Sequence, residues 1–217
     1  AGENGAIATS VIVGKRALSL KDGIALEKSY DGSPYSKTLV SADFAELASG
    51  DEATLVVSTR TSSVGTYPDA DSVLDADLTI VNKDGKVVTN NYAFENNLTV
   101  TINPATIKYT PPQDTSFTFD GKEHRVDIVQ TETEGCDVSY RYNLNDARAA
   151  SLSAIRNAGV YTVYYTISRQ NYTSVEGSFT VTVEKANATI TAKPQSTIYG
   201  QAFLLDQSAY TATDLFG

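Results

Sequence analysis

The side chains best suited to chemistry are one histidine and one cysteine, His124 and Cys136. A catalytic or zinc-binding histidine needs partner groups, and the sequence has no second histidine or cysteine to complete a common zinc site. No G-x-S-x-G motif, H-E-x-x-H motif or phosphate-binding glycine loop is present. We therefore expect a non-enzymatic protein without a cofactor. We expect His124 to be an exposed strand residue and Cys136 a small residue in a strand, not a reactive thiol.

A second group of candidates is the acidic stretch PDADSVLDAD. Carboxylates suit Ca²⁺, and extracellular calcium at millimolar concentration fills even weak sites. The stretch lacks the mid-loop glycine and the distal glutamate of an EF-hand loop. Two hypotheses stay open, a calcium site and, favoured by this spacing, a solvated acidic loop. The candidate ligands are Asp69, Asp71, Asp75 and Asp77.

The third group is aromatic. Tyrosine rings exposed on a sheet could stack on the apolar face of a sugar, and the candidates are Tyr140, Tyr142 and Tyr164. The alternative is that tyrosines fill the core and its rim, because the chain has 13 Tyr but no Trp and no Met. The composition favours this alternative.

The elements that must position these residues are strands. Phe179, Val181 and Val183 alternate with threonines, which predicts a strand with one face on a core. Helix is expected only as a turn or short helix over 42–48 and 146–156. No apolar run is long enough to span a membrane. The net charge of −9 argues against a nucleic-acid partner, which requires clustered Lys and Arg.

One pattern occurs three times along the chain. It reads VIVGKRALSL from Val11, VTINPATIKY from Val100 and VTVEKANATI from Val181. Each copy is followed by a glycine mark, SYDG, TFDG and a looser IYG. The first two copies are offset by 89 residues by both marks. The first copy carries about 14 additional residues between its tyrosines Tyr67 and Tyr92, including a hairpin turn predicted at 83–85.

The Asp-Gly that follows an aromatic residue predicts a turn. Glycine accepts positive φ without strain, and an aspartate side chain bonds to nearby backbone. The third copy departs from this mark because it has no aspartate. The residues of this structural turn motif are Tyr30, Asp31, Gly32, Phe119, Asp120, Gly121, Tyr199 and Gly200.

The aromatic-Asp-Gly mark, the strand AGVYTVYY, the Asn-Tyr-Thr and the closing VTVEKA resemble the YDG/MBG-type repeats. Those repeats occur in tandem in large bacterial extracellular and cell-wall proteins. The resemblance implies a mostly β chain of tandem small modules, β-grasp-like or Ig-like sandwiches, in an elongated arrangement. The expected segments are 1–13 as a leading strand or the end of a preceding module, 14–103 as a first module with an insertion near 68–90, 104–184 as a second module, and 185–217 as the start of a truncated third.

The function that the resemblance implies is a stalk or spacer in an adhesin-like protein, at the bacterial surface or secreted. Its partners would be neighbouring modules of the same chain, with no nucleic acid and no membrane insertion by this segment. One alternative is a module that binds host glycan or protein through loops or an open sheet edge. A second is an ancillary domain of an extracellular carbohydrate-active enzyme.

Overall fold

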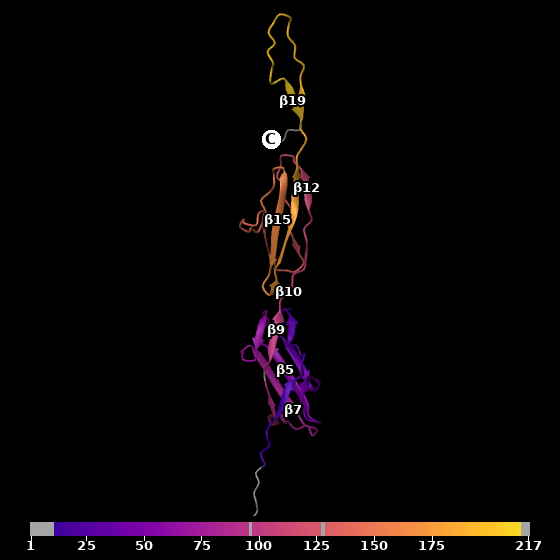
Figure 1. Ribbon diagram of the computed structural model, residues 1–217, viewed down its shortest axis with the longest axis vertical. Helices are drawn as coiled ribbons and strands as arrows, with labels where there is room; N and C mark the ends of the chain where they lie inside the picture. Colours follow the sequence, from indigo (N-terminus) through magenta and orange to yellow (C-terminus); the bar gives the residue numbers. More distant parts are fainter. Residues whose placement is uncertain (1–10, 96, 127–128, 214–217) are drawn as a thin grey trace, which may run out of the picture. The chain divides into compact units, whose positions relative to one another are not determined.

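The computed structural model describes residues 11–95, 97–126 and 129–213. The chain divides after residue 105 into two compact units, which are described separately. The regular secondary structure of both is almost entirely strand, which confirms the predicted mostly β fold (Figure 1). Within the described ranges the only helical segments are the 3-10 turns η1 (Ser41–Asp43) and η2 (Thr89–Asn91), so no helix forms over 146–156. In these same ranges no helix is long and apolar enough to cross a membrane.

Unit 1 is built from three small sheets, with strand orders β4-β1-β8, β2-β9-β6 and β3-β5-β7. Its strands are β1 (Arg16–Leu20), β2 (Glu27–Ser29), β3 (Ser36–Val40), β4 (Phe44–Ala45), β5 (Glu52–Thr59), β6 (Gly65–Pro68), β7 (Leu74–Val81), β8 (Tyr92–Phe94) and β9 (Thr99–Asn103).

The core of unit 1 follows from the alternation of its strands. In β5, every second residue from Ala53 to Thr59 is buried, while Glu52, Thr54 and Val56 face solvent. Burial of this kind is the main favourable term in folding, about 25 cal/mol per Å² of apolar surface. The largest fully buried side chains of the unit are Leu18, Leu39, Leu55, Val57, Ile80, Val100 and Ile102.

Part of the acidic stretch predicted as a solvated loop forms a strand: Asp69 and Asp71 lie in a turn, but Asp75 and Asp77 lie on β7. Strand β7 pairs antiparallel with β5 along its whole length, from Glu52↔Val81 to Thr59↔Leu74. Ile80 on this strand is completely buried. The hairpin turn predicted at 83–85 is present, because Asn82 N donates to Lys86 O (2.9 Å). The segment therefore completes the sheet β3-β5-β7.

Unit 2 is dominated by one four-stranded sheet of order β12-β17-β15-β14. Two-stranded sheets of order β11-β13, β10-β16 and β18-β19 complete the strand pairings. The strands are β10 (Ala105–Thr106), β11 (Tyr109–Thr110), β12 (Thr115–Thr118), β13 (Gln130–Thr131), β14 (Asp137–Arg141), β15 (Gly159–Ser168), β16 (Tyr172–Thr173), β17 (Val175–Glu184), β18 (Thr189–Ala192) and β19 (Tyr210–Thr213).

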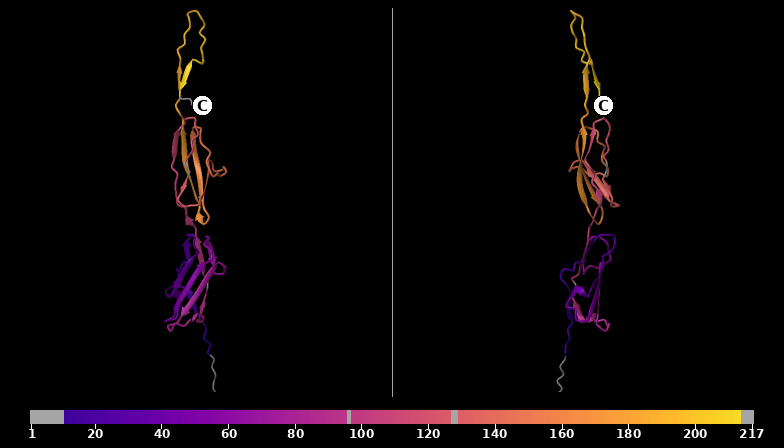
Figure 2. Two further views of the ribbon diagram at one scale, coloured as in Figure 1. Left: turned by 180° about the vertical axis from the view of Figure 1, so that it is seen from behind. Right: turned by 90° about the vertical axis from the view of Figure 1, so that its right-hand side faces the viewer.

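A long hairpin supplies the core of unit 2. Strands β15 and β17 pair antiparallel over most of their length and lie lengthwise in the unit (Figure 2). Their alternating residues point into the core together with side chains from the loops around them. The buried set is Ile107, Val129, Tyr140, Ile155, Val163, Tyr165, Ile167, Phe179, Val181 and Val183.

The same tyrosine contact occurs in both units. Tyr67 at β6 donates from its hydroxyl to Ser63 O (2.8 Å), and Tyr161 at the start of β15 donates to Asn157 O (2.9 Å). In each case the acceptor lies four residues upstream. A tyrosine bonded back to upstream backbone near the start of a strand is a hallmark of Ig-like sandwiches, called the tyrosine corner. This contact favours the Ig-like alternative over the β-grasp-like one.

In each unit an early strand runs parallel to the last strand. In unit 1, β2 pairs with β9, and in unit 2, β12 pairs with β17. Each pairing joins a strand near the beginning of the unit to the last strand that contributes to its core, and in unit 2 the hairpin of β18 and β19 follows that strand. As a result, the chain enters each unit at one end and leaves it at the opposite end (Figure 1).

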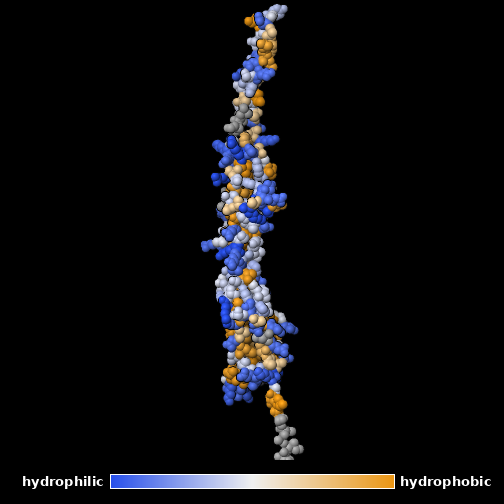
Figure 3. Space-filling view, turned by 90° about the vertical axis from the view of Figure 1, so that its left-hand side faces the viewer, coloured by the Kyte–Doolittle hydropathy of each residue, from blue (hydrophilic) through white to orange (hydrophobic). Residues whose placement is uncertain are grey.

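After β17, strands β18 and β19 form a hairpin that exposes apolar side chains (Figure 3). Ile190 on β18 is 69% exposed, whereas Leu18 in β1 and Ile107 near β10 are almost completely buried. Leu18 and Ile107 are the eighth residues of their copies of the sequence pattern, and Ile190 is the tenth residue of its copy, in an Ala-Thr-Ile run like that of Ile107. Among the described residues, no core packs against the exposed apolar side chains of this hairpin.

Candidate functional site

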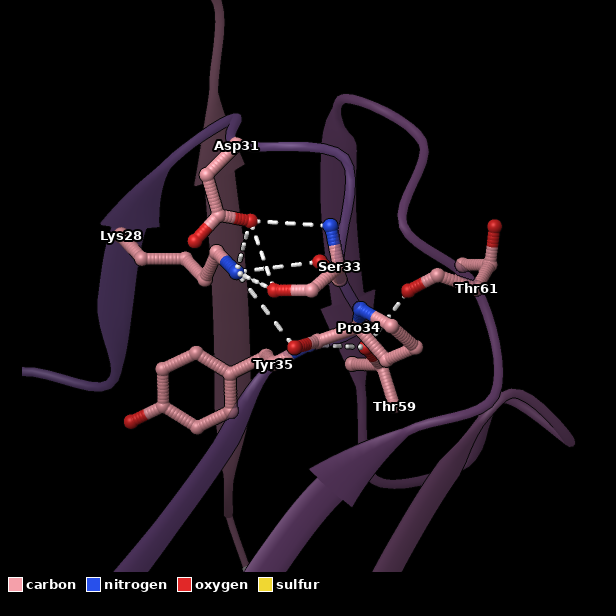
Figure 4. Close-up of polar contacts among 7 residues, drawn as sticks. All are labelled: Lys28, Asp31, Ser33, Pro34, Tyr35, Thr59 and Thr61. Carbon is pink, nitrogen blue, oxygen red and sulfur yellow. Dashed lines mark hydrogen bonds and ion pairs between the residues drawn. The ribbon is translucent and has the colours of Figure 1, made fainter.

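A cluster of hydrogen bonds in unit 1 surrounds Asp31, in the turn after β2 (Figure 4). Its Oδ1 accepts hydrogen bonds from Ser33 N (2.9 Å), Ser33 Oγ (2.7 Å) and Lys28 Nζ (2.6 Å). Gly32 between them has φ of 86°, a conformation that only glycine adopts without strain. The aspartate thus fixes a turn that the glycine makes possible.

Lys28 ties this turn to strand β2. Besides Asp31, its ammonium donates to Ser33 O (3.0 Å) and Ser33 Oγ (2.9 Å), and the lysine side chain is only 20% exposed. The Lys28 ammonium, followed by the Ser33 hydroxyl and amide, holds the pKa of Asp31 well below its usual range. The carboxylate is therefore charged at any physiological pH and acts as an acceptor.

Acid should weaken this turn. Because the folded pKa of Asp31 is depressed, its contribution is complete above the unfolded pKa of about 3.9. As pH falls below that value, the unfolded chain takes up the proton first, so the stability of unit 1 decreases. We expect Asp31→Asn to flatten the fall in urea midpoint below about pH 4. Lys28→Gln should flatten it too, and an unchanged slope in both variants would contradict the assignment.

Below the turn, two hydrogen bonds join Tyr35 and Thr59 (Figure 4). Thr59 N donates to Tyr35 O (3.0 Å), and Tyr35 N donates to Thr59 Oγ1 (3.0 Å). The Thr59 hydroxyl in turn donates to Thr61 O (2.7 Å). Thr59 is a buried polar residue, and these bonds satisfy its hydroxyl as burial requires.

Replacing Tyr35 with phenylalanine should stabilise unit 1. Its side chain is 3% exposed, and its hydroxyl is buried without a partner among the described residues. An unsatisfied buried hydroxyl costs about 1 kcal/mol or more, so Tyr35→Phe should raise the free energy of unfolding of unit 1 by about 1 kcal/mol. Urea denaturation measures this gain.

The control for that prediction is Tyr92→Phe, which should have the opposite sign. The Tyr92 hydroxyl donates to Asp51 Oδ2 (2.6 Å) and accepts from Ala48 N (3.1 Å). Removing it should cost about 1 kcal/mol. Equal effects of the two substitutions would show that the Tyr35 hydroxyl is satisfied in solution.

The corresponding turn of unit 2 uses different side chains. Asp120 Oδ1 accepts from Lys122 N (3.0 Å), as Asp31 does from Ser33 N, and lies 3.0 Å from His124 Nε2. The His124 ring stacks on Phe117 in β12, with 4.4 Å between centroids. The hydrogen bond from the Lys122 amide, followed by the nearby His124 ring, lowers the pKa of Asp120. The expectation that His124 is exposed was wrong, since its side chain is only 16% exposed.

Both turns are attached to the last strand of their unit. Tyr30 N donates to Asn103 O at the end of β9 (2.8 Å), and Phe119 N donates to Glu184 O at the end of β17 (2.8 Å). The donor in each case is the aromatic residue of the aromatic-Asp-Gly mark. The mark therefore lies where an early strand of the unit meets the last strand.

The third mark makes a turn without a carboxylate. Gly200 has φ of 89°, and Gln201 N donates to Ile198 O (3.0 Å). The side chain of Tyr199 is fully exposed, unlike that of Tyr30, which packs against the core of unit 1.

The four aspartates proposed for calcium are not brought together. Asp75 forms a two-pronged pair with Arg60 at the surface, through Nε (2.8 Å) and Nη2 (2.5 Å), and Arg60 lowers its pKa. Asp71 Oδ1 accepts from Val73 N (3.1 Å). In the part of the chain that the structure describes, no three His, Cys, Asp or Glu side chains lie close enough to hold a metal ion.

The three tyrosines proposed as a sugar platform do not share one surface. Tyr140 is 2% exposed, and its hydroxyl accepts from Val129 N (3.0 Å), so it belongs to the core. Tyr164 lines a cavity of about 250 Å³. Tyr142 lines a different cavity, of about 590 Å³, together with Tyr161. The ring of Tyr142 instead packs against that of Tyr161, with centroids 6.3 Å apart.

Cys136 lies one residue before β14, half-buried and against the core of unit 2 rather than within a strand. The residues that sequence reasoning missed are Lys28, Ser33 and Phe117. Their only sequence signal is proximity to the Asp-Gly mark. No family model matches the chain, and no curated protein matches its sequence.

Proposed function

We propose that this chain is a non-enzymatic spacer, built from copies of one small Ig-like sandwich and belonging to the stalk of a bacterial surface or secreted protein. The supporting observation is the path of the chain through each unit. It enters at one end and leaves at the opposite end, because an early strand and the last strand run parallel (Figure 1). In a unit with this path, the points where the chain enters and leaves are separated by the length of the unit.

The pairing registers support the view that the two units are copies. Gly65 pairs with Ile102 in unit 1, and Gly159 pairs with Val183 in unit 2. Ser29 pairs in parallel with Asn103, and Thr118 with Glu184. These are the residues that the sequence pattern aligns. The resemblance to YDG/MBG-type repeats accounts for such copies in a bacterial extracellular protein.

Small-angle X-ray scattering of the chain tests the spacer. A compact protein of this length would have a radius of gyration of roughly 17 Å. A spacer should exceed that value well beyond error, at low and high salt alike, because its length is set by strands and not by charge repulsion. A radius near the compact value would contradict the proposal.

A glycan-binding module is the second candidate, favoured by the cavity that joins Tyr142 and Tyr161. Asp146, Arg156 and Asn157 also line it and supply polar groups for sugar hydroxyls. Binding on a glycan array that Tyr142→Ala abolishes would support this candidate. Tyr164→Ala is the matched control, because Tyr164 lies on the same sheet but outside this cavity. Absence of binding would leave the spacer as the better proposal.

A further inference from the structure

We propose that each unit is a force-bearing module, in which the parallel pair of early and last strands is a shear clamp and the aromatic-Asp-Gly turn is its latch. The inference deepens the proposed spacer function, because a stalk is stretched by whatever is attached to its ends. It concerns the strength of the units under tension, whereas scattering tests only their extension.

The geometry of the clamp follows from strand direction. In unit 2, β12 pairs with β17 from Thr115↔Val181 to Thr118↔Glu184, both strands running the same way. Tension reaches β12 through β10 and β11, which form only short two-stranded sheets, and then pulls β12 from its beginning and β17 from its end, in opposite directions along the strands. The hydrogen bonds between parallel strands run across that direction. They are therefore loaded together, whereas an antiparallel hairpin pulled from its open end loses its bonds one after another.

Unit 1 has the same arrangement, with two parallel pairs instead of one. Strand β1 pairs in parallel with β8, and β2 pairs in parallel with β9. Within the second pair, Thr101 N donates to Leu26 O (2.9 Å) and Tyr30 N to Asn103 O (2.8 Å). Tension between the ends of this unit therefore also shears parallel bonds.

The turn acts as a latch because it stops the early strand from sliding. In unit 1, Lys28 on β2 is bonded to Asp31 and Ser33 of the turn, so the strand and the turn move as one body (Figure 4). That body is fixed to β5 by the bonds between Tyr35 and Thr59. Sliding β2 along β9 would have to break these bonds as well.

Unit 2 reaches the same result with other side chains. Phe117 on β12 stacks on His124, and His124 bonds to Asp120 of the turn. The backbone of His124 is joined to Ile155 by two hydrogen bonds (2.8 and 3.0 Å). The two units therefore use different side chains at equivalent parallel pairs. What they share is that the early strand is bonded to the turn that follows it.

Single-molecule stretching of the whole chain between its two ends is the test. Each unit should unfold in one event that releases on the order of 300 Å of chain. The decisive variant is Phe117→Pro, which removes a backbone donor from the clamp. Strand alternation places the N–H of Phe117 on the same side as that of Phe119, which bonds to Glu184.

Two matched controls accompany it. Ser116→Pro puts a proline in the same strand, where the N–H points away from β17 on the edge of the sheet. Phe117→Ala removes the ring but keeps the donor. We expect Phe117→Pro to lower the unfolding force of one event by about twofold or more, and Ser116→Pro to leave it unchanged. Phe117→Ala should lower it less than Phe117→Pro.

A second pulling direction keeps the proposal testable even if Phe117→Pro fails to fold. Handles on Val160→Cys and Lys185→Cys, in a Cys136→Ser background, pull β15 and β17 apart from neighbouring ends, since Val160 pairs with Thr182. Val160 is 70% exposed and tolerates the change. Unit 2 should unfold at a clearly lower force in this direction than end to end. Equal forces in both directions, or equal losses in the two proline variants, would overturn the clamp.

Discussion

Replacing Gly177 with alanine should strongly lower the free energy of unfolding of unit 2. A Cβ at this position would lie 2.3 Å from the Tyr165 hydroxyl oxygen and 2.4 Å from its Cζ. The ring lies across the glycine because Tyr165 is its partner in the β15–β17 hairpin. Overpacking of this severity costs about 3 kcal/mol, and a loss of that size lowers the Tm of a small domain by roughly 12–24 °C.

The Tyr165 ring has no room to move aside. It is 4% exposed and packs against Tyr109 and Phe179, with centroids 6.2 and 6.5 Å away. Burial, together with a hydrogen bond to Tyr109, raises its pKa to about 12, so the hydroxyl stays neutral.

Calorimetry of the Gly177→Ala chain should show one transition lowered and the transition of unit 1 unchanged. Ser178→Ala is the matched control, a neighbouring and exposed position on the same strand. The double variant Gly177→Ala with Tyr165→Leu should lose less stability than the sum of the two single variants, because it lacks the ring that clashes with the added Cβ. Strict additivity would mean that the ring and the glycine do not touch.

Gly32→Val is expected to have the next largest effect, and it acts on unit 1. Gly32 has φ of 86°, where a residue with a Cβ is strained by roughly 1–2 kcal/mol and a β-branched one by more. No neighbouring atom lies within 4 Å of the added Cβ, so the loss comes from the backbone alone. We expect the free energy of unfolding to fall by about 2 kcal/mol.

The control is Gly32→Asn, because asparagine visits this backbone region more readily than any β-branched residue. It should lose much less than Gly32→Val in urea denaturation. Gly121→Val should repeat the effect in unit 2, where φ is 74°. Unchanged stability in both valine variants would refute the role assigned to the turns.

The strands and the turn glycines could be predicted because their signals are local. Val163 and Val181 lie in runs that alternate strictly, and such runs form half-buried strands. The glycines of the first two marks, Gly32 and Gly121, follow an aspartate, a pair that predicts a turn with positive φ. The structure gives both glycines that backbone conformation.

Strand β7 was missed although its signal was present. Leu74, Ala76, Leu78 and Ile80 alternate with Asp75, Asp77 and Thr79, which is the pattern of a half-buried strand. An acidic strand with one buried face looks like an acidic loop when only its charged residues are considered.

The latches could not be predicted, because their contacts depend on packing between segments. The run EKSYDGS does not predict the contact between Lys28 and Asp31, because a lysine at a strand position normally extends into water. The stack of Phe117 on His124 joins a strand to the far side of a turn. Tyr140 and Tyr142 are two residues apart, so strand alternation alone would place them on the same face. Tyr140 is buried because the loop at Val129 packs against it.

The parallel pairs also set the order in which a unit can fold. Glu27 pairs with Thr101, and Thr115 with Val181, so each pair joins residues separated by most of the length of its unit. Contacts between such distant residues make folding slow, because the chain loses loop entropy before they form. During synthesis the closing strand is the last to emerge. Each unit therefore remains an open assembly of hairpins until its final strand arrives, and a single late step completes the fold.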